Sequence, residues 1–257
     1  MSGGLLAGFW GLVGGSALLL GAAIAWFTRL PQRLIAAVMA IGSGVLISAV
    51  AFDLMDEAYR QGGFTATAAG FIAGGIAYTA ANVVLSRRGA RHRKRSGTVT
   101  HAQQPDAQAP AGGDTGLAIA VGALLDGIPE SVVIGVSLLD GSGVSTVTVA
   151  AVFLSNVPEG LSSAAGMKAA GRSAAYVFGV WGGIALVSGI AALIGNVALA
   201  SAGAPTIAAV TAIAAGAILA MLVDTMIPEA TEATHDYSGL IAVVGFLAAF
   251  VLSKAGG

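Results

Sequence analysis

Two short motifs of similar sequence place acidic side chains inside apolar stretches of the chain. The first is Leu125–Ser131 (LDGIPES) and the second is Leu154–Gly160 (LSNVPEG), which begins 29 residues further along. Each stretch is long enough to cross a membrane as a helix, and neither contains Lys or Arg. Because an ionised carboxylate is costly in hydrocarbon, we expect a metal ion or a proton to balance Asp126, Glu130 and Glu159.

The helical period places the polar side chains of each motif on one face. Residues four positions apart share a face, so Asp126 lies beside Glu130, and Ser155 lies beside Glu159. Each motif has Pro directly before its Glu, and Pro has no N–H to bond the carbonyl four residues earlier. Carboxylate, amide, hydroxyl and freed carbonyl oxygens together suit a divalent cation. The predicted metal ligands are Asp126, Glu130, Ser155, Asn156 and Glu159. The alternative is that the prolines only kink the helices and the acids are buried in protonated form.

The composition indicates an all-α membrane protein. Of 257 residues, 56% are hydrophobic and 10% are charged, whereas a soluble domain carries about 25% charged residues. The chain has no Cys, which excludes disulfides and thiolate metal sites. We expect no prosthetic group and no nucleic-acid partner, and the sequence leaves a homodimer open. Apolar stretches of about 20 residues predict eight transmembrane helices, at 5–27, 34–56, 64–85, 116–138, 144–166, 174–196, 205–227 and 238–254.

The basic residues predict the orientation in the membrane. All Lys and Arg except Arg60 and Lys254 follow the first, third or fifth span. The positive-inside rule then places both termini outside the cytoplasm and the long basic loop 86–114 inside it. The polar composition of this loop predicts disorder. The expected organisation is a single multi-pass domain of the inner or plasma membrane, formed by residues 1–85 and 115–257.

A second pair of acidic segments lies at the ends of two other spans. Asp53 and Glu57 end the second span on the predicted outer side, and Asp224 and Glu229 end the seventh on the predicted inner side. The two segments resemble each other and run in opposite directions. We interpret these four residues as vestibules that concentrate cations at the two mouths of one pathway. The alternative is that they are acids at the aqueous ends of helices.

These features resemble the ZIP family of zinc and iron permeases over the whole chain. The matching motifs are Asp126-Gly127-Ile128-Pro129-Glu130-Ser131 and Ser155-Asn156-Val157-Pro158-Glu159-Gly160, with Asp56-Glu57-Ala58 on the second span. The resemblance implies a bundle of three, two and three helices with inverted repeats and metal sites between spans four and five. It also implies one site formed by Asp126, Glu130, Ser155 and Glu159, and an adjacent second site at Asn156, the shared glutamates and Gly127.

In that family each of the two motifs begins with His. In this chain Asp126 and Ser155 occupy those positions, and no His lies inside a predicted span. An all-oxygen ligand set favours harder ions such as manganese. We therefore expect a transporter, and no enzyme, that moves zinc, iron or manganese as its substrate. A proton-coupled carrier of an organic substrate is the alternative. An intramembrane aspartyl protease using Asp126 and Asp224 is a further one, although the Gly-x-Gly-Asp signature of such enzymes is absent.

Overall fold

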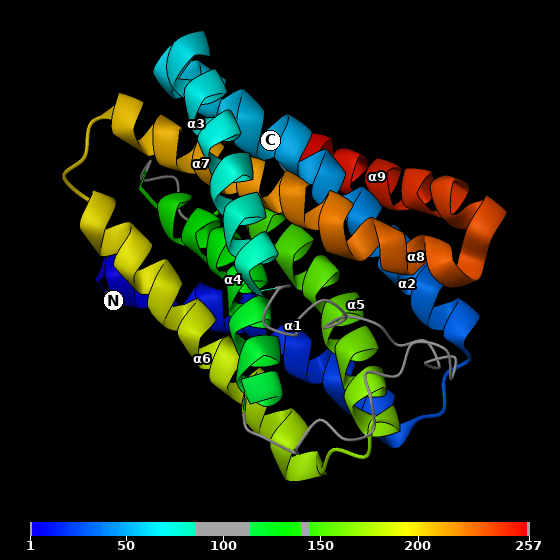
Figure 1. The fold of residues 1–257 in the computed structure, drawn as a ribbon. Coiled ribbons are helices and arrows are strands. Elements are labelled where there is room, and N and C mark those ends of the chain that lie inside the picture. Colours follow the sequence, from blue (N-terminus) through cyan, green and yellow to red (C-terminus); the bar gives the residue numbers. More distant parts are fainter. Residues whose placement is uncertain (1, 86–113, 140–143, 256–257) are drawn as a thin grey trace.

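The regular elements of the described chain are all helical, as the composition predicts (Figure 1). The structure is a computed structural model, which describes residues 2–85, 114–139 and 144–255. The predicted disordered loop 86–114 lies outside the described residues except for Asp114, which begins a helix.

The first part of the chain forms two long helical pieces. Helix α1 (Gly3–Phe27) is followed by α2 (Gln32–Ala49), which continues through a π-helical turn, Val50–Leu54, into α3 (Met55–Leu85). The predicted second and third spans are therefore joined without a separate loop. They are divided at Gly63, where φ is 69° and ψ is −178°. Gly tolerates this positive φ because it has no Cβ, and the chain reverses direction there.

The rest of the chain contains four long helices and a segmented one. These are α4 (Asp114–Val136), α5 (Thr146–Ala169), α6 (Ala174–Leu199), α7 (Ala204–Met221) with its π-helical continuation Leu222–Met226 and α8 (Ile227–Thr234), and α9 (Ser238–Ala255). Local sequence explains several boundaries. Ser145 caps α5 by accepting from the Thr148 N–H at 3.2 Å, and Ser173 caps α6 by accepting from the Tyr176 N–H at 3.3 Å. Gly171, with φ of 75°, stands between these two helices.

In the described residues, five helices are long and apolar enough to cross a membrane. They are Gly3–Phe27, Gln32–Leu85, Ala174–Leu199, Ala204–Glu232 and Ser238–Ala255. They do not include α4 and α5, the two helices that carry the duplicated motif. The multi-pass character of the chain agrees with the sequence, whereas the number of eight spans stays a prediction.

The helices pack as two groups. The first group consists of α1, α4, α5 and α6, and the second consists of α2, α3, α7, α8 and α9. Close backbone contacts join helices within a group. A Cβ on Gly160 of α5 would overlap the Leu18 carbonyl of α1, and one on Gly216 of α7 would overlap the Phe71 carbonyl of α3. Small residues permit such close approach between membrane helices. The two groups meet mainly where α2 lies against α5 and where α4 lies against α7.

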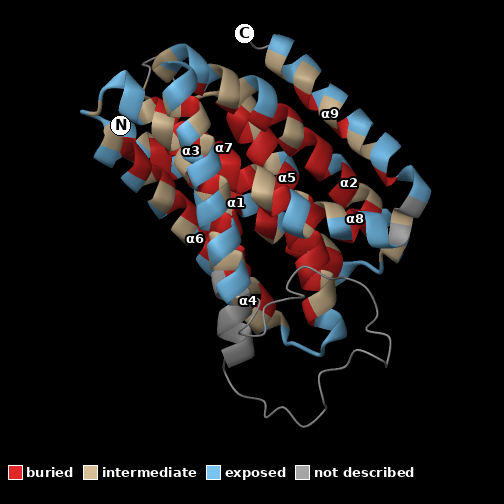
Figure 2. Ribbon diagram, turned by 45° about the horizontal axis from the view of Figure 1, so that its top comes forward, coloured by how far each residue is buried: buried red, intermediate tan, exposed pale blue. Residues whose placement is uncertain are grey.

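The outward faces of the bundle are apolar, which fits a lipid environment. Buried residues line the inward faces of α2, α5 and α7 (Figure 2). Large exposed apolar side chains occur on α3, α6 and α9, for example Phe64, Ile76, Leu186, Ile194 and Val243. In water such surfaces would mark a binding or aggregation site, but in a bilayer lipid covers them.

Both chain termini lie at one end of the bundle. Gly4, near the N-terminus, faces Val197 at the end of α6. Ser253, near the C-terminus, bonds Asp53. We call this the termini end. At the opposite end, Lys168 of α5 donates to the Trp26 carbonyl at 2.5 Å, at the end of α1.

Candidate cation site

The first motif lies on α4, which continues as a helix through Pro129. Asp126 is 0% exposed and Glu130 is 1% exposed, as the sequence predicts for intramembrane acids. The Tyr78 hydroxyl of α3 donates to Asp126 Oδ1 at 2.6 Å. The motif hydroxyl, Ser131, donates to the Gly127 carbonyl of its own helix at 2.6 Å. Tyr78, which belongs to the second helix group, therefore positions the predicted ligand Asp126. The sequence did not predict a role for this tyrosine.

The second motif lies on α5, which continues through Pro158. Ser155, Asn156 and Glu159 are all buried. Ser155 Oγ donates to the Val152 carbonyl at 2.9 Å, and Asn156 Nδ2 donates to the Gly14 carbonyl of α1 at 3.0 Å. The amide of Asn156 thus ties α5 to α1 within the first helix group.

The structure buries all five predicted ligands on neighbouring helices. However, α4 and α5 meet over only a short stretch. Within the described ranges, no three His, Asp or Glu side chains gather closely enough to hold a metal ion. Convergence of Asp126, Glu130, Ser155 and Glu159 on one cation therefore stays a prediction. Such convergence requires these side chains to reorient. Asp126 would also have to exchange its hydrogen bond to Tyr78 for a bond to the cation.

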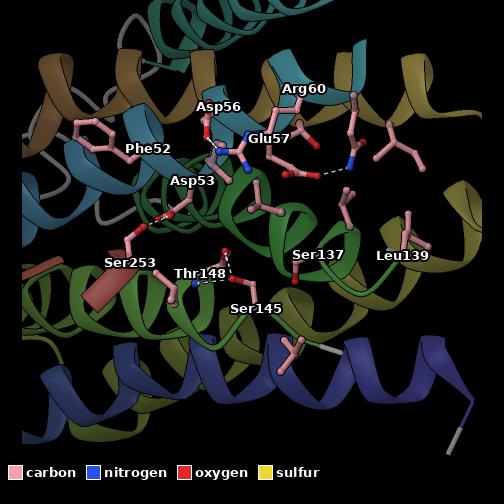
Figure 3. A pocket seen from close by; sticks show the side chains of 18 of the residues that line it. Phe52, Asp53, Asp56, Glu57, Arg60, Ser137, Leu139, Ser145, Thr148 and Ser253 are labelled. Atoms are coloured by element: carbon pink, nitrogen blue, oxygen red, sulfur yellow. Dashed lines mark hydrogen bonds and ion pairs between the residues drawn. The ribbon is translucent and has the colours of Figure 1, made fainter. Parts of the chain in front are cut away.

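A cavity of about 800 Å3 opens at the termini end (Figure 3). Its walls come from five parts of the chain. These are the π-helical turn with the start of α3, the end of α4, the start of α5, the start of α7, and the C-terminal turn of α9. The cavity includes the predicted vestibule residues Asp53 and Glu57.

The polar side chains of this cavity are arranged in short contacts. Asp53 accepts from Ser253 at 2.6 Å, and Glu57 accepts from Gln61 at 2.5 Å. Asp56 pairs with Arg60 at 2.6 Å, on a solvent-exposed face of α3 (Figure 3). An exposed pair of this kind contributes little to stability. It does reduce the negative charge that an entering cation would meet.

The vestibule is less acidic than the sequence pattern suggests. The cavity lining contains Arg60 and Lys254 beside its three acids, Asp53, Asp56 and Glu57. These two are the basic residues that the sequence placed on the same side as the termini. Lys254 lies 5.9 Å from the ring centre of Phe52. Only folding brings the C-terminal turn of α9 against the π-helical turn.

The inner end of the cavity approaches both motifs. Beside Asp53 the cavity adjoins a void of about 10 Å3, close to the smallest volume that can hold one water molecule. The void is lined by apolar side chains, including Val133 of α4 and Val152 of α5. Val133 follows Glu130 by three residues, and Val152 precedes Ser155 by three. Residues that line the cavity and the void therefore lie about one helical turn along α4 and α5 from the candidate ligands Glu130 and Ser155.

The structure does not place the two acids of the predicted inner vestibule, Asp224 and Glu229, in one shared environment. Asp224 is exposed and accepts from Asn82 Nδ2 at 3.0 Å. Glu229 is only 4% exposed, and its Oε1 accepts from the Ser162 hydroxyl of α5. The two acids that the sequence placed together at one mouth therefore have different surroundings.

Two π-helical turns carry the first acid of each of these segments. Asp53 lies in Val50–Leu54 and Asp224 in Leu222–Met226. Each bonds a neighbouring helix of the second group, Asp53 through Ser253 of α9 and Asp224 through Asn82 of α3. π-Helical turns inside longer helices are frequent at functional sites. Their occurrence at both acids was not predicted from the sequence.

No family model matches this chain, and no curated protein is significantly similar to it in sequence.

Proposed function

We propose that this chain is a divalent transition-metal transporter that moves zinc, iron or manganese across the inner or plasma membrane. The observation that carries the proposal is the position of the cavity. It opens at the termini end beside Asp53, and residues that line it or the adjoining void, Val133 and Val152, lie about one helical turn along α4 and α5 from Glu130 and Ser155. An open cavity close in the chain to buried acids on apolar helices supports an ion pathway, because intramembrane acids are functional-site candidates.

The proposed topology has eight spans in a three, two and three arrangement, with both termini outside the cytoplasm. The reversal at Gly63 supports a division of Gln32–Leu85 into two spans. The packing of α3 on α7 and of α2 on α9 supports an inverted repeat, because each pair joins an outer span of one half to a middle span of the other. The resemblance to ZIP permeases in the two Pro-Glu motifs points to the same topology.

In the proposed pathway, a hydrated cation enters through the cavity at the termini end. It then exchanges water for oxygens of Asp126, Glu130, Ser155, Asn156 and Glu159, and leaves past Asp224 and Glu229. Access alternates by movement of one helix group relative to the other. An all-oxygen ligand set favours manganese over the softer ions. Cation affinity falls at acidic pH because protons compete for the carboxylates.

Cation uptake into proteoliposomes tests the proposal. The wild-type protein should take up Mn²⁺, Zn²⁺ or Fe²⁺, and the double variant Glu130→Gln, Glu159→Gln should lose uptake. The substitution is nearly isosteric, so loss of transport with an unchanged unfolding temperature would locate the defect in the site. Asp236→Asn, which changes an exposed acid, is the matched control. Wild-type uptake by the double variant, or no uptake of any of the three metals by the wild type, would contradict the proposal.

A proton-coupled carrier of an organic substrate is the second candidate, and the cavity provides an observation in its favour. Its volume of about 800 Å3 is that of a small-molecule site. Phe52, Arg60 and Lys254 offer aromatic and basic groups in its lining. Thermal-shift screens with divalent metals and with organic anions separate the two candidates. Stabilisation by organic anions and not by metals would favour the carrier.

A further inference from the structure

A buried polar contact joins the two helix groups toward the end opposite the termini. The Ser162 hydroxyl of α5 donates to Glu229 Oε1 of α8. Ser162 is 0% exposed and Glu229 is 4% exposed. Buried hydrogen bonds to charged groups are stronger than neutral ones, because little water competes with them. Separation of α5 from α8 must break this bond.

The surroundings of this contact are packed. Residues 158–164 of α5 are all buried. Toward the opposite end, an apolar cluster joins Leu161, Ala164 and Met167 of α5 to Ile35 of α2 and Ala25 of α1. In the described residues, α5 is therefore tightly packed toward the opposite end, whereas an open cavity adjoins the end of α4 at the termini end.

The two motifs differ at the residue that makes this contact. Ser162 stands three residues after Glu159, and the corresponding residue after Glu130 is Val133. Val133 lines the open cavity, as does Glu57, the counterpart of Glu229 in the other acidic segment. A valine side chain has no hydrogen-bonding group. If Val133 met Glu57 at the termini end, as Ser162 meets Glu229 at the opposite end, the valine side chain could not donate a hydrogen bond.

We propose that the Ser162–Glu229 contact holds the opposite end of the pathway closed and thereby favours the conformation that is open at the termini end. The bias arises because the duplicated motif has Ser at this position in one copy and Val in the other. This inference rests on the proposed transport function, since it assigns a role to a contact along that pathway. The inference concerns only which end of the pathway is open, so it can be tested without measuring transport.

Cysteine accessibility provides the test, because the chain has no native Cys. Ser137→Cys reports on the cavity at the termini end, since Ser137 lines it. Ala164→Cys and Ile35→Cys report on the opposite end, since both residues lie in the apolar cluster there. Each reporter is placed in the full chain in nanodiscs, which expose both faces, with a chelator present. The rate of reaction with a hydrophilic maleimide is then measured.

In the otherwise wild-type chain, the Ser137→Cys reporter should react much faster than the two reporters at the opposite end. Adding Ser162→Ala should raise the reaction rates of Ala164→Cys and Ile35→Cys about ten- to hundredfold, the range expected for loss of one hydrogen bond to a charged group. It should lower the rate of Ser137→Cys or leave it unchanged. The matched control is Ser163→Ala, a buried serine on the same turn, which should change neither opposite-end reporter.

A double exchange, Val133→Ser with Ser162→Val, moves the hydroxyl from one copy of the motif to the other. We expect it to lower the reaction rate of Ser137→Cys and to raise that of Ile35→Cys. Unchanged rates at Ala164→Cys and Ile35→Cys in both Ser162→Ala and the double exchange, with both proteins folded, would overturn the inference. Equal effects of Ser162→Ala and Ser163→Ala would also overturn it. If uptake fails but these rate changes occur, the proposed function is wrong and the contact still controls opening.

Discussion

The hydroxyl of Tyr78 donates a 2.6 Å hydrogen bond to Oδ1 of Asp126, and both side chains are almost fully buried. Tyr78 belongs to α3 in the second helix group and Asp126 to α4 in the first. This bond therefore crosses between the groups at the first acidic residue of the duplicated motif. A cation that binds Asp126 must compete with this hydroxyl or share the carboxylate with it.

Tyr78→Phe removes the hydroxyl and keeps the ring. We expect the free energy of unfolding to fall by about 1.5–3 kcal/mol, the range for a hydrogen bond to a charged group. We also expect a change in the KM for cation uptake, because the position of the Asp126 carboxylate is altered. Tyr176→Phe is the control, since in the described structure the Tyr176 hydroxyl has no hydrogen-bond partner. Equal stability and equal KM in both variants would show that the Tyr78 bond is unimportant.

Lys254→Gln removes a positive charge from the cavity lining. Because the lining has three acids and two bases, we expect the initial rate of cation uptake to rise at low ionic strength, about two- to fivefold. The increase should disappear near 0.5 M salt, where charges are screened within a few ångströms. Arg33→Gln, at the exposed start of α2 on the opposite end, is the control. A salt-independent change would argue against an electrostatic cause.

Gly160→Ala introduces a methyl group where α5 crosses α1. The added Cβ would overlap the backbone of Leu18, so the helices must separate. We expect a loss of about 1–3 kcal/mol in the free energy of unfolding, as for other overpacked sites. Around Gly182 of α6 there is no atom within 4 Å of an added Cβ. Gly182→Ala should therefore have little effect, and similar losses in both variants would contradict the packing argument.

Gly63→Ala tests the reversal between α2 and α3. An added Cβ at Gly63 would meet no atom within 4 Å, so its cost comes from the positive φ alone. We expect the variant to lose about 1–3 kcal/mol of unfolding free energy, because this combination of φ and ψ is essentially restricted to Gly. Gly63→Asn should lose a similar amount, because Asn tolerates the left-handed helical region, where ψ is about +30 to +60°, and Gly63 has a ψ of −178°. Equal stability of Gly63→Ala and the wild type would show that the turn adopts another conformation.

The sequence alone determined the class of fold and the burial of the acids. Apolar stretches of helical length leave few alternatives to membrane helices, because backbone groups in lipid must be bonded internally. The burial of Asp126, Glu130, Ser155, Asn156 and Glu159 followed from their position within those stretches. Helix boundaries at Ser145 and Ser173 could be predicted because capping is a local interaction.

Tertiary structure decided which residues meet across the bundle. Tyr78 with Asp126, Ser162 with Glu229, and Ser253 with Asp53 are 48, 67 and 200 residues apart. No local pattern encodes such contacts, because they depend on how helices cross. The same holds for the basic residues of the cavity and for the difference between Glu57, which is open to the cavity, and Glu229, which is buried. Similar sequence segments acquire different surroundings when the two ends of a bundle pack differently.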